Sequence, residues 1–439
     1  MANRIYLCLA HMSEAGLEQK YIQEAFDTNW VAPLGPNVNG FEEDLKAFVG
    51  QGKEVVALTT GTAAVHLSLI ACGVEPGDEV ITQSFTFCAS AHPVTYLGAT
   101  PVFVDSEKDT WNMDPDLLEE AIKDRIAKTG KKPKVIMPVA LYGMPYQIDR
   151  ILEIANRYDI PVVEDAAEGF GSRYDGQVLG TFGRYGILSF NGNKMITTSG
   201  GGALICPNKE EGERVMWYAT QARESYPYYQ HETIGYNYRM SNICAGIGRG
   251  QMTIVNEHIA HHQHVHQLYV ELFSKIDGIE VHSQPANGRY ASNYWLTSIT
   301  IDENLKIKGQ ENAYKEIITS PVGGVPAVIH AASSARTDCQ PNDNVEALRM
   351  ALEKAGIESR PLWKPMHKQP VYCRTNEKLG MRNEELSHGI IRQTSATSVA
   401  YVNGVSENIF KKGMCLPAGP WVKDEDVKRI VETIKANII

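Results

Sequence analysis

Two residues could do chemistry together, Lys194 in the segment SFNGNK and Asp165 in the segment PVVEDAAEGFG. Asp165 directly follows an apolar run typical of a buried strand, and Lys194 lies in the polar turn after the next such run. Ligands of open α/β sheets bind beyond the carboxyl ends of the strands, so both side chains are expected at one edge of a sheet. A lysine amine shielded from water there can attack an aldehyde and form an imine.

A third feature is the segment TTGTAAVHLSL, in which Gly61 permits a tight turn and Thr62 and Ala63 begin a helix. The free backbone N–H groups at a helix start favour an anion such as phosphate. Phosphate site, carboxylate and amine are together what pyridoxal 5'-phosphate (PLP) requires, because its ring nitrogen stays protonated beside an aspartate. Taken singly, the three features are equally compatible with an ordinary turn, a helix-capping aspartate and a surface lysine.

The elements that must position these residues follow an alternating pattern. From about residue 54, short apolar runs alternate with amphipathic stretches, which indicates an α/β fold with a mostly parallel sheet covered by helices. The expected strands are EVVALT, DEVITQ, TPVFVD, KVIMPV, PVVEDA, GILSF and GGALICP. The expected helices between them are TAAVHLSLIACGV, FCASAHPVTYLG, DPDLLEEAIKDRI and QIDRILEIANRYD, and helical character dominates from about 209 to 276.

A chain of 439 residues is too long for one compact core, so two domains are predicted. We expect a large cofactor-binding domain over residues 1–255 and a smaller α+β domain over residues 256–439. In the second domain the expected strands are NYWLTSITI and GIESRPLW, and the expected helices are NVEALRMALEKAG and DEDVKRIVETIKANI. The stretch 304–344 lacks sustained periodicity, and no fold is predicted for it.

Over nearly its whole length the sequence resembles the DegT-type nucleotide-sugar aminotransferases, which are PLP enzymes of fold type I. The resemblance is carried by NWVAPLGPNVNGFEEDLKAF, GTAAVHLSL, SFTFCAS, EDAAEGFGS, SFNGNK, GYNYRMSN and GIESRPLWKPMH. It implies a fold-type I transferase architecture and an aminotransferase activity with PLP as cofactor.

The resemblance also implies roles for individual residues. Lys194 would join the cofactor as an imine, Asp165 would pair with the pyridine nitrogen, and Phe87 would stack on the ring. The phosphate would be held by backbone at Gly61, Thr62 and Ala63 and by the Ser189 hydroxyl. Glu168 would lie near the ring hydroxyl, at a position where family members often have Gln or His. Asn237 would reach the phosphate across a homodimer interface, so that each site is shared by two subunits.

The substrate expectation comes from the same source. The segments TTSGGG and ESRPLWKPMH are similar to those of enzymes that make 4-amino-4,6-dideoxy sugars on UDP, and they place Arg360 and His367 near the sugar nucleotide. The expected reaction moves an amino group from L-glutamate to a UDP-4-keto-6-deoxy-HexNAc sugar, for surface polysaccharide or glycan biosynthesis. Lys194 would act first as base and then as acid in a ping-pong transfer.

Composition argues against several other classes of protein. The net charge of -10, from 42 Lys and Arg against 52 Asp and Glu, argues against a nucleic-acid binder. The lack of a long apolar segment argues against a membrane protein, and a cytoplasmic location is expected. Five histidines lie in EHIAHHQHVHQ, but without a carboxylate motif such as HExxH we expect a solvated helix face and no metal site.

Three alternatives remain at this level. PLP-dependent sugar dehydrases resemble this family but have a His where Lys194 stands. A dinucleotide-binding dehydrogenase would need a GxGxxG segment after its first strand, which this chain lacks. A non-catalytic PLP-binding regulator would bind the cofactor without amino transfer from glutamate, and a half-reaction assay would identify it.

Overall fold

The fold is given by a computed structural model that describes residues 4–315, 339–373, 384–385, 391–394 and 398–439. Its centre is a sheet of two hydrogen-bonded groups, in the orders β14-β15-β16-β3-β2-β4 and β5-β8-β9-β1. The parallel bridges Ile136–Val162 and Val139–Asp165 join the two groups between β4 and β5. The strands are β1 (Glu54–Leu58), β2 (Glu79–Gln83), β3 (Thr100–Val104), β4 (Val135–Met137), β5 (Val163–Asp165), β8 (Tyr185–Ser189), β9 (Gly202–Cys206), β14 (Glu384–Glu385), β15 (Ile391–Thr394) and β16 (Val399–Val402).

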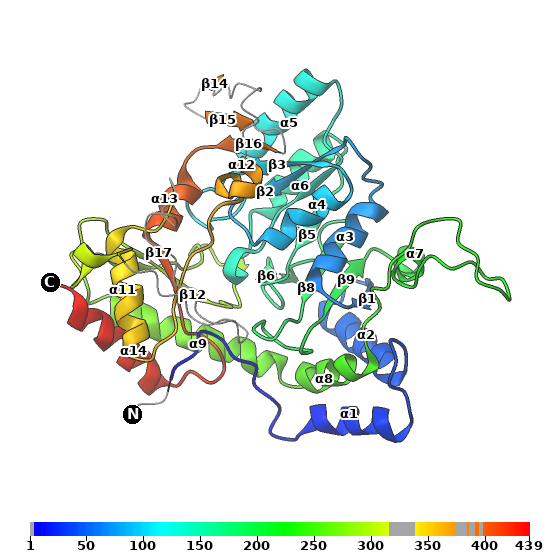
Figure 1. Cartoon of the computed structure of the whole chain (residues 1–439), viewed down its shortest axis with the longest axis horizontal. Coiled ribbons are helices and arrows are strands. Elements are labelled where there is room, and N and C mark those ends of the chain that lie inside the picture. The colour runs from blue at the N-terminus through cyan, green and yellow to red at the C-terminus, as the bar shows by residue number, and fades with distance from the viewer. Residues whose placement is uncertain (1–3, 316–338, 374–383, 386–390, 395–397) are drawn as a thin grey trace.

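Both faces of this sheet are buried, which explains why its strands are continuous apolar runs. In β1, Val55 and Ala57 pack into one apolar cluster while Val56 and Leu58 pack into another on the opposite face. The helices α3 (Gly61–Ala71) and α7 (Lys209–Ala219) contact the sheet near β1 and β9, whereas α2 (Pro36–Val49) and α5 (Pro115–Thr129) pack with the other cluster. The layered arrangement is visible in Figure 1. The predicted α/β architecture is confirmed.

The remaining helices of this part are α1 (Leu17–Asp27), α4 (His92–Tyr96), α6 (Ile148–Arg157) and α8 (Asn242–Met252), with 3-10 turns η1 (Cys88–Ser90) and η2 (Leu141–Gly143). The prediction of one continuous helix in FCASAHPVTYLG is wrong. Pro93 stands in the first turn of α4 and cannot donate a helical hydrogen bond to the preceding turn, so the segment divides into η1 and α4.

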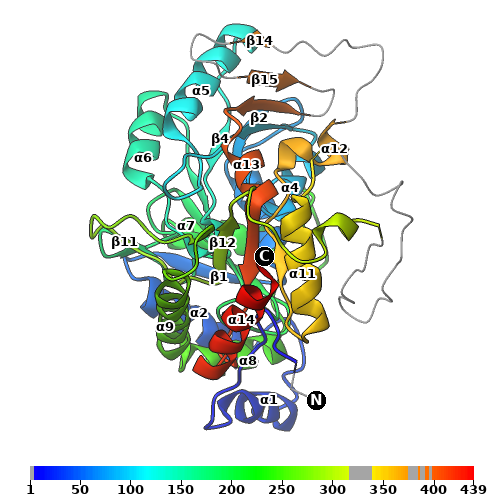
Figure 2. The ribbon, with the colours of Figure 1, turned by 90° about the vertical axis from the view of Figure 1, so that its left-hand side faces the viewer.

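A second sheet has the antiparallel order β10-β12-β17-β13, with β10 (Ile279–Val281), β12 (Thr297–Ile301), β13 (Arg360–Pro361) and β17 (Gly413–Leu416). It shares an apolar cluster with α9 (Val255–Phe273), α11 (Asp343–Lys354) and α14 (Asp424–Asn437). Figure 2 shows α9, α11 and α14 beside these strands, and the N-terminal segment joins them through the Ile5–Ile357 bridge.

The smaller elements are the three-stranded group β11 (Tyr290–Ala291), β6 (Arg173–Tyr174) and β7 (Gln177–Val178), together with η3 (Gln310–Asn312), η4 (Met366–Lys368), α12 (Pro370–Cys373) and α13 (Val405–Lys412). β16 pairs in parallel with β3, so a strand from beyond residue 256 belongs to the central sheet. The division into residues 1–255 and 256–439 stays a prediction. Residues 316–338 of the stretch 304–344 lie outside the described residues. No helix in the described ranges is long and apolar enough to cross a membrane.

Candidate active site

Lys194 lies in the turn after β8, with its side chain 13% exposed. Its backbone N–H donates to Asn191 O, which closes the turn. Its Nζ lies 3.1 Å from Glu168 Oε1 and 3.9 Å from the centre of the Trp295 ring. The Trp295 indole N–H donates to Asn193 O at 2.6 Å, which ties the ring to the same turn. The amine is thus held in place by a carboxylate and an aromatic face.

Asp165 ends β5 and is buried at the carboxyl edge of the central sheet. Its Oδ2 accepts a 2.6 Å hydrogen bond from Ser90 Oγ, and its Oδ1 accepts the backbone N–H of Ala167. Burial raises the pKa of Asp165, and these two hydrogen bonds and the Lys194 charge oppose that rise. A buried carboxylate held by two donors is suited to pair with a protonated ring nitrogen.

Glu168 lies three residues further on, in the bend that follows β5, and is buried at 4% exposure. Its Oε2 accepts the backbone N–H of Tyr142 at 2.7 Å, and Oε1 contacts Lys194. Burial raises the pKa of Glu168 to about 7, and the Lys194 charge opposes this rise. Tyr142 has a positive φ of 52°, a conformation that costs energy outside glycine, so the fold maintains a strained residue to aim this amide.

The start of α3 supplies amide donors to the same region. Thr60 caps the helix, because its Oγ1 accepts the Ala63 N–H at 2.9 Å and its carbonyl accepts the Ala64 N–H. The Gly61 and Thr62 N–H groups have no acceptor in the part of the chain that the structure describes. A side chain at position 61 would lie 3.0 Å from Ser189 Cβ, so Gly61 keeps the helix start close to the end of β8.

These groups share one cavity of about 1260 Å³. The predicted site residues that line it are Gly61, Thr62, Phe87, Asp165, Glu168, Ser189, Lys194 and Arg360. Phe87 projects into the opening with 53% exposure, and its ring centre lies 5.3 Å from that of Trp363.

The donor set fits PLP. Two helix-start amides that have no acceptor among the described residues lie beside the Ser189 side chain and suit a phosphate. A buried carboxylate suits a protonated ring nitrogen, and the Lys194 amine suits an aldehyde. The helix-start amides and the Lys194 amine come from loops at the same edge of the sheet, which places them in reach of one ligand.

Comparison with known proteins identifies the family. Residues 13–319 match the model of the DegT/DnrJ/EryC1/StrS aminotransferase family. The chain is 40% identical over 434 residues to EpsN of Bacillus subtilis (strain 168), whose name describes a pyridoxal phosphate-dependent aminotransferase, and the match covers 99% of this chain and 96% of EpsN. It is 30% identical over 429 residues to a GDP-perosamine synthase of Escherichia coli O157:H7, covering 98% of each chain. A DegT DnrJ EryC1 StrS aminotransferase from Brucella abortus has the same fold, with a TM-score of 0.76 and 25% identity over 96% of this chain and 95% of that one.

The chain belongs to the DegT/DnrJ/EryC1/StrS aminotransferase family. It is a PLP-dependent aminotransferase with the fold expected of that family.

Three predicted site residues of this aminotransferase do not line the cavity: Ala63, Asn237 and His367. Ala63 N–H is already engaged by Thr60. Asn237 is exposed in the segment before α8, where its side chain accepts a hydrogen bond from Gln221. His367 is buried, and its Nδ1 forms a 2.6 Å hydrogen bond with Ser84 Oγ. Neither residue lines the cavity.

Several cavity residues of the aminotransferase were not predicted. Trp295 and Trp363 come from the second half of the chain, and Tyr142 comes from η2. Its hydroxyl accepts the Trp363 N–H at 2.8 Å, which connects the two parts of the cavity wall. Trp363 lies in the segment GIESRPLWKPMH, which had pointed only to Arg360 and His367. Trp295 and Tyr142 lie in no such segment, and their contacts join parts of the chain that are far apart in the sequence. The positive φ of Tyr142 could not be predicted either, because tyrosine is not a residue type that favours this backbone conformation.

The histidine run of the aminotransferase lies on α9, and the expectation of a solvated face is wrong for three of its members. His258, His262 and His266 are buried. His266 stacks on Tyr294 with ring centres 3.6 Å apart, and His262 Nδ1 lies 3.2 Å from Tyr294 O. Within the described ranges no group of three His, Cys, Asp or Glu side chains could hold a metal ion.

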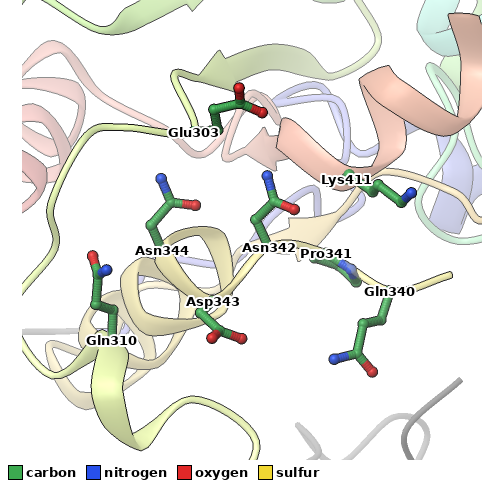
Figure 3. Close-up of a pocket in the computed structure, with 8 residues that line it drawn as sticks. All are labelled: Glu303, Gln310, Gln340, Pro341, Asn342, Asp343, Asn344 and Lys411. Carbon is green, nitrogen blue, oxygen red and sulfur yellow. The ribbon is translucent and has the colours of Figure 1, made fainter. Parts of the chain in front are cut away.

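A smaller polar pocket of about 430 Å³ lies near the start of α11 and shares one lining residue, Pro341, with the cavity. Figure 3 shows its lining side chains, Glu303, Gln310, Gln340, Pro341, Asn342, Asp343, Asn344 and Lys411. It contains none of the predicted site residues, so the chemistry of the aminotransferase is assigned to the larger cavity.

Proposed function

We propose that this enzyme transfers an amino group from L-glutamate to the keto group of a nucleotide-linked sugar, of the UDP-4-keto-6-deoxy-HexNAc type, for polysaccharide or glycan synthesis. The observation that carries the proposal is the meeting of Lys194, Asp165 and the free Thr62 amide in one cavity. The E. coli relative is named a GDP-perosamine synthase, that is, after a nucleotide-linked sugar, which supports this substrate class.

The size of the cavity supports a large second substrate. Pockets for small ligands typically have about 300–1,000 Å³, and this one has about 1260 Å³. Its outer wall carries Arg360, whose Nη2 donates to Glu358 Oε1 at 2.9 Å, and Lys364. In the proposed complex, these cations lie on the side of the cavity that receives the nucleotide diphosphate.

Each protein group has a defined task in this proposal. PLP, when bound, supplies an electron-withdrawing ring that stabilises negative charge at the carbon bearing the amino group. Lys194 would hold the cofactor through its amine, and as a free amine it would accept and return the proton at the reacting carbon. Asp165 would keep the ring nitrogen protonated, Phe87 would pack on the ring, and Thr62 and Ser189 would hold the phosphate. Glu168 and Trp295 keep the Lys194 amine oriented toward the cavity.

We further propose that the active unit is a homodimer in which Asn237 of each subunit completes the phosphate site of its partner. The exposure of Asn237 and of Tyr226, Tyr228, Tyr229 and Ile234 in the preceding segment supports an interface there.

The test is a pair of half-reactions. PLP-loaded enzyme is mixed with L-glutamate while 2-oxoglutarate and the cofactor absorbance are measured, and the aminated enzyme is then mixed with a panel of 3-keto and 4-keto sugars on UDP and GDP. Amination of a nucleotide sugar is expected. Reaction with simple keto acids alone would refute the substrate, and loss of a sugar hydroxyl without amino transfer would identify a dehydrase.

Lys194→Ala is expected to abolish amino transfer while the protein still binds PLP noncovalently. Borohydride reduction followed by mass spectrometry measures the covalent link, which should be present at residue 194 in the wild type and absent from the variant. Lys53→Ala is the matched control, because Lys53 is a part-buried lysine that does not line the cavity. Turnover by the Lys194 variant near the wild-type rate would exclude the proposed role.

A further inference from the structure

Glu168 is a buried carboxylate with one cation beside it. Its side chain is 3% exposed, and Oε1 lies 3.1 Å from Lys194 Nζ. The other oxygen accepts one neutral donor, the Tyr142 N–H. Lys194 is its single ion-pair partner within the described ranges. The negative charge of Glu168 therefore depends on the positive charge of one side chain.

The other titratable groups around this pair cannot replace that charge. Asp165 is a second carboxylate and disfavours the anion of Glu168. Burial raises the pKa of the Cys8 and Cys415 thiols to about 12 and holds the pKa of Tyr142 well above its ordinary value. The three groups are therefore neutral at pH 7, so the ammonium of Lys194 alone balances Glu168.

The role proposed for Lys194 requires that this charge be lost. An amine must be uncharged to bond to an aldehyde or to accept a proton from a substrate. A carboxylate left buried without a counter-ion is costly, and such a group takes up a proton instead. Burial already raises the pKa of Glu168 with the ammonium present, and loss of that ammonium acts in the same direction.

We propose that Glu168 accepts the proton that Lys194 releases and returns it when the amine is recharged. The N–H bond of the ammonium breaks, an O–H bond forms on Glu168, and the ion pair becomes a neutral amine and a neutral carboxylic acid, with no change in total charge. Glu168 is thus a positioning residue that acts through Lys194, and this inference rests on the role proposed for that lysine.

The experiment replaces the lysine charge in the full-length, cofactor-free chain and measures the protonation of Glu168 directly. Infrared spectra of the Lys194→Met variant, labelled with ¹³C-glutamate, are recorded between pH 6 and pH 10 to follow the protonated carboxyl band. Because an opposite charge at this distance shifts a carboxyl titration by about 1–3 pH units, the midpoint should rise by that amount above the wild-type value. The Lys194→Met/Glu168→Gln double variant should lack the band.

Lys53→Met is the matched control, because it removes a part-buried lysine near another buried carboxylate, Glu164, and should leave the Glu168 band unchanged. If Lys194→Met does not fold, acetylation of Lys194 in the folded wild type removes the same charge. A band midpoint that stays at the wild-type value after either treatment overturns the proposal. This outcome is separable from failure of the proposed function, since the band is read without cofactor or substrate.

Discussion

Asp165, at the end of β5, and Glu168, in the bend that follows it, are carboxylates whose surroundings suit them to different tasks. Asp165 accepts two hydrogen bonds, from Ser90 Oγ and Ala167 N–H, which favour its anion, and within the described ranges no ion-pair partner competes with a cationic ligand for it. Glu168 is already paired with Lys194. Both carboxylates line one cavity at the edge of the sheet. Their different tasks follow from their hydrogen-bond and ion-pair partners and not from the residue type.

At Asp165, substitution by Asn is expected to lower the rate of the glutamate half-reaction by about 10²–10³-fold, the size of effect seen when one electrostatic contact to developing charge is removed. The reason is that a neutral amide no longer keeps the ring nitrogen protonated. Single-turnover absorbance changes measure this rate. Ser90→Ala, which removes a hydrogen bond but keeps the carboxylate, should lose much less. A rate for Asp165→Asn close to that of Ser90→Ala would contradict the role.

At the scale of the element, α9 carries buried neutral histidines that couple folding to pH. Burial lowers the pKa of His262 to about 3 and that of His266 to about 4, while the unfolded value is about 6.5. The folded state therefore binds fewer protons than the unfolded state between these values. The stability contribution is fully present above pH 6.5 and is lost as the pH falls toward 4.

We predict that His262→Gln reduces this pH dependence. Each buried histidine contributes a slope of about 1.4 kcal/mol per pH unit in the free energy of unfolding between pH 6.5 and pH 4. Urea unfolding of wild type and variant at several pH values measures the slope of each protein. The buried carboxylates are the same in both proteins, so their contributions cancel in the difference between the two slopes. His264→Gln is the control, because His264 is exposed and pairs with Asp424. Equal slopes for wild type and His262→Gln would refute the prediction.

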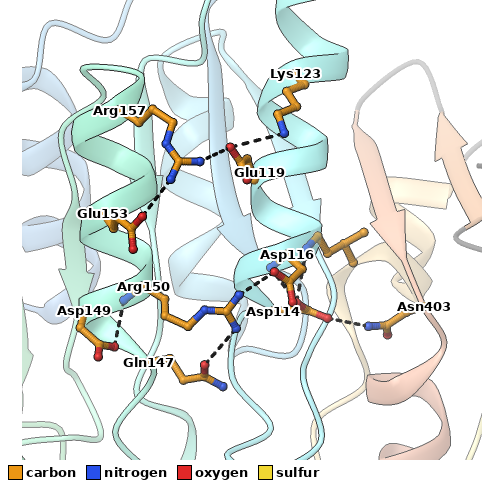
Figure 4. Close-up of polar contacts among 11 residues, drawn as sticks. Asp114, Asp116, Glu119, Lys123, Gln147, Asp149, Arg150, Glu153, Arg157 and Asn403 are labelled. Carbon is orange, nitrogen blue, oxygen red and sulfur yellow. Dashed lines mark hydrogen bonds and ion pairs between the residues drawn. The ribbon is translucent and has the colours of Figure 1, made fainter. Parts of the chain in front are cut away.

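The ion pairs of the helices differ in what they contribute. Figure 4 shows Arg150 and Arg157 on α6 reaching Asp116 and Glu119 on α5 across an exposed surface. By contrast, Arg239 contacts Glu42 on α2 with side chains 8% and 12% exposed. Water screens the first set, whereas removing one partner of the second leaves a buried charge.

Arg239→Ala is therefore expected to lower the free energy of unfolding by about 3–5 kcal/mol, because Glu42 would remain buried without its partner. Arg150→Ala should cost less than about 1 kcal/mol. Urea unfolding at one pH compares the two variants. Similar losses in both would mean that burial does not determine the strength of these pairs.

At the scale of the whole molecule, a shared site predicts complementation between inactive subunits. Lys194→Ala and Asn237→Ala homodimers should both have low activity. In a mixed dimer, both substitutions fall in one site and the other site is intact, so random mixing should restore about one quarter of the wild-type activity. Activity after unfolding and refolding the two variants together measures this, with each variant refolded alone as the control. Absence of recovery, with mixed dimers demonstrated by mass spectrometry, would exclude shared sites.

Local information was sufficient for the main elements and for the groups of chemical interest. A strand buried on two faces is a continuous apolar run, and a helix buried on one face has apolar residues at helical spacing. The elements β1 to β5 and helices such as α3 and α5 could therefore be predicted from their apolar spacing. Asp165, Lys194 and the start of α3 follow strands, and the rule that strand ends converge placed them at one edge.

Long-range packing decided what no local pattern contains. Trp295 against Lys194, Trp363 against Phe87 and β16 beside β3 each join segments more than 100 residues apart, and their pairing depends on how the two sheets fit together. The same packing buries His262 and gives His367 a partner outside the cavity, since a buried polar side chain needs a hydrogen-bond partner and a neighbouring segment supplies it. Residue type and spacing thus selected the chemistry, whereas contacts between distant segments decided which groups meet.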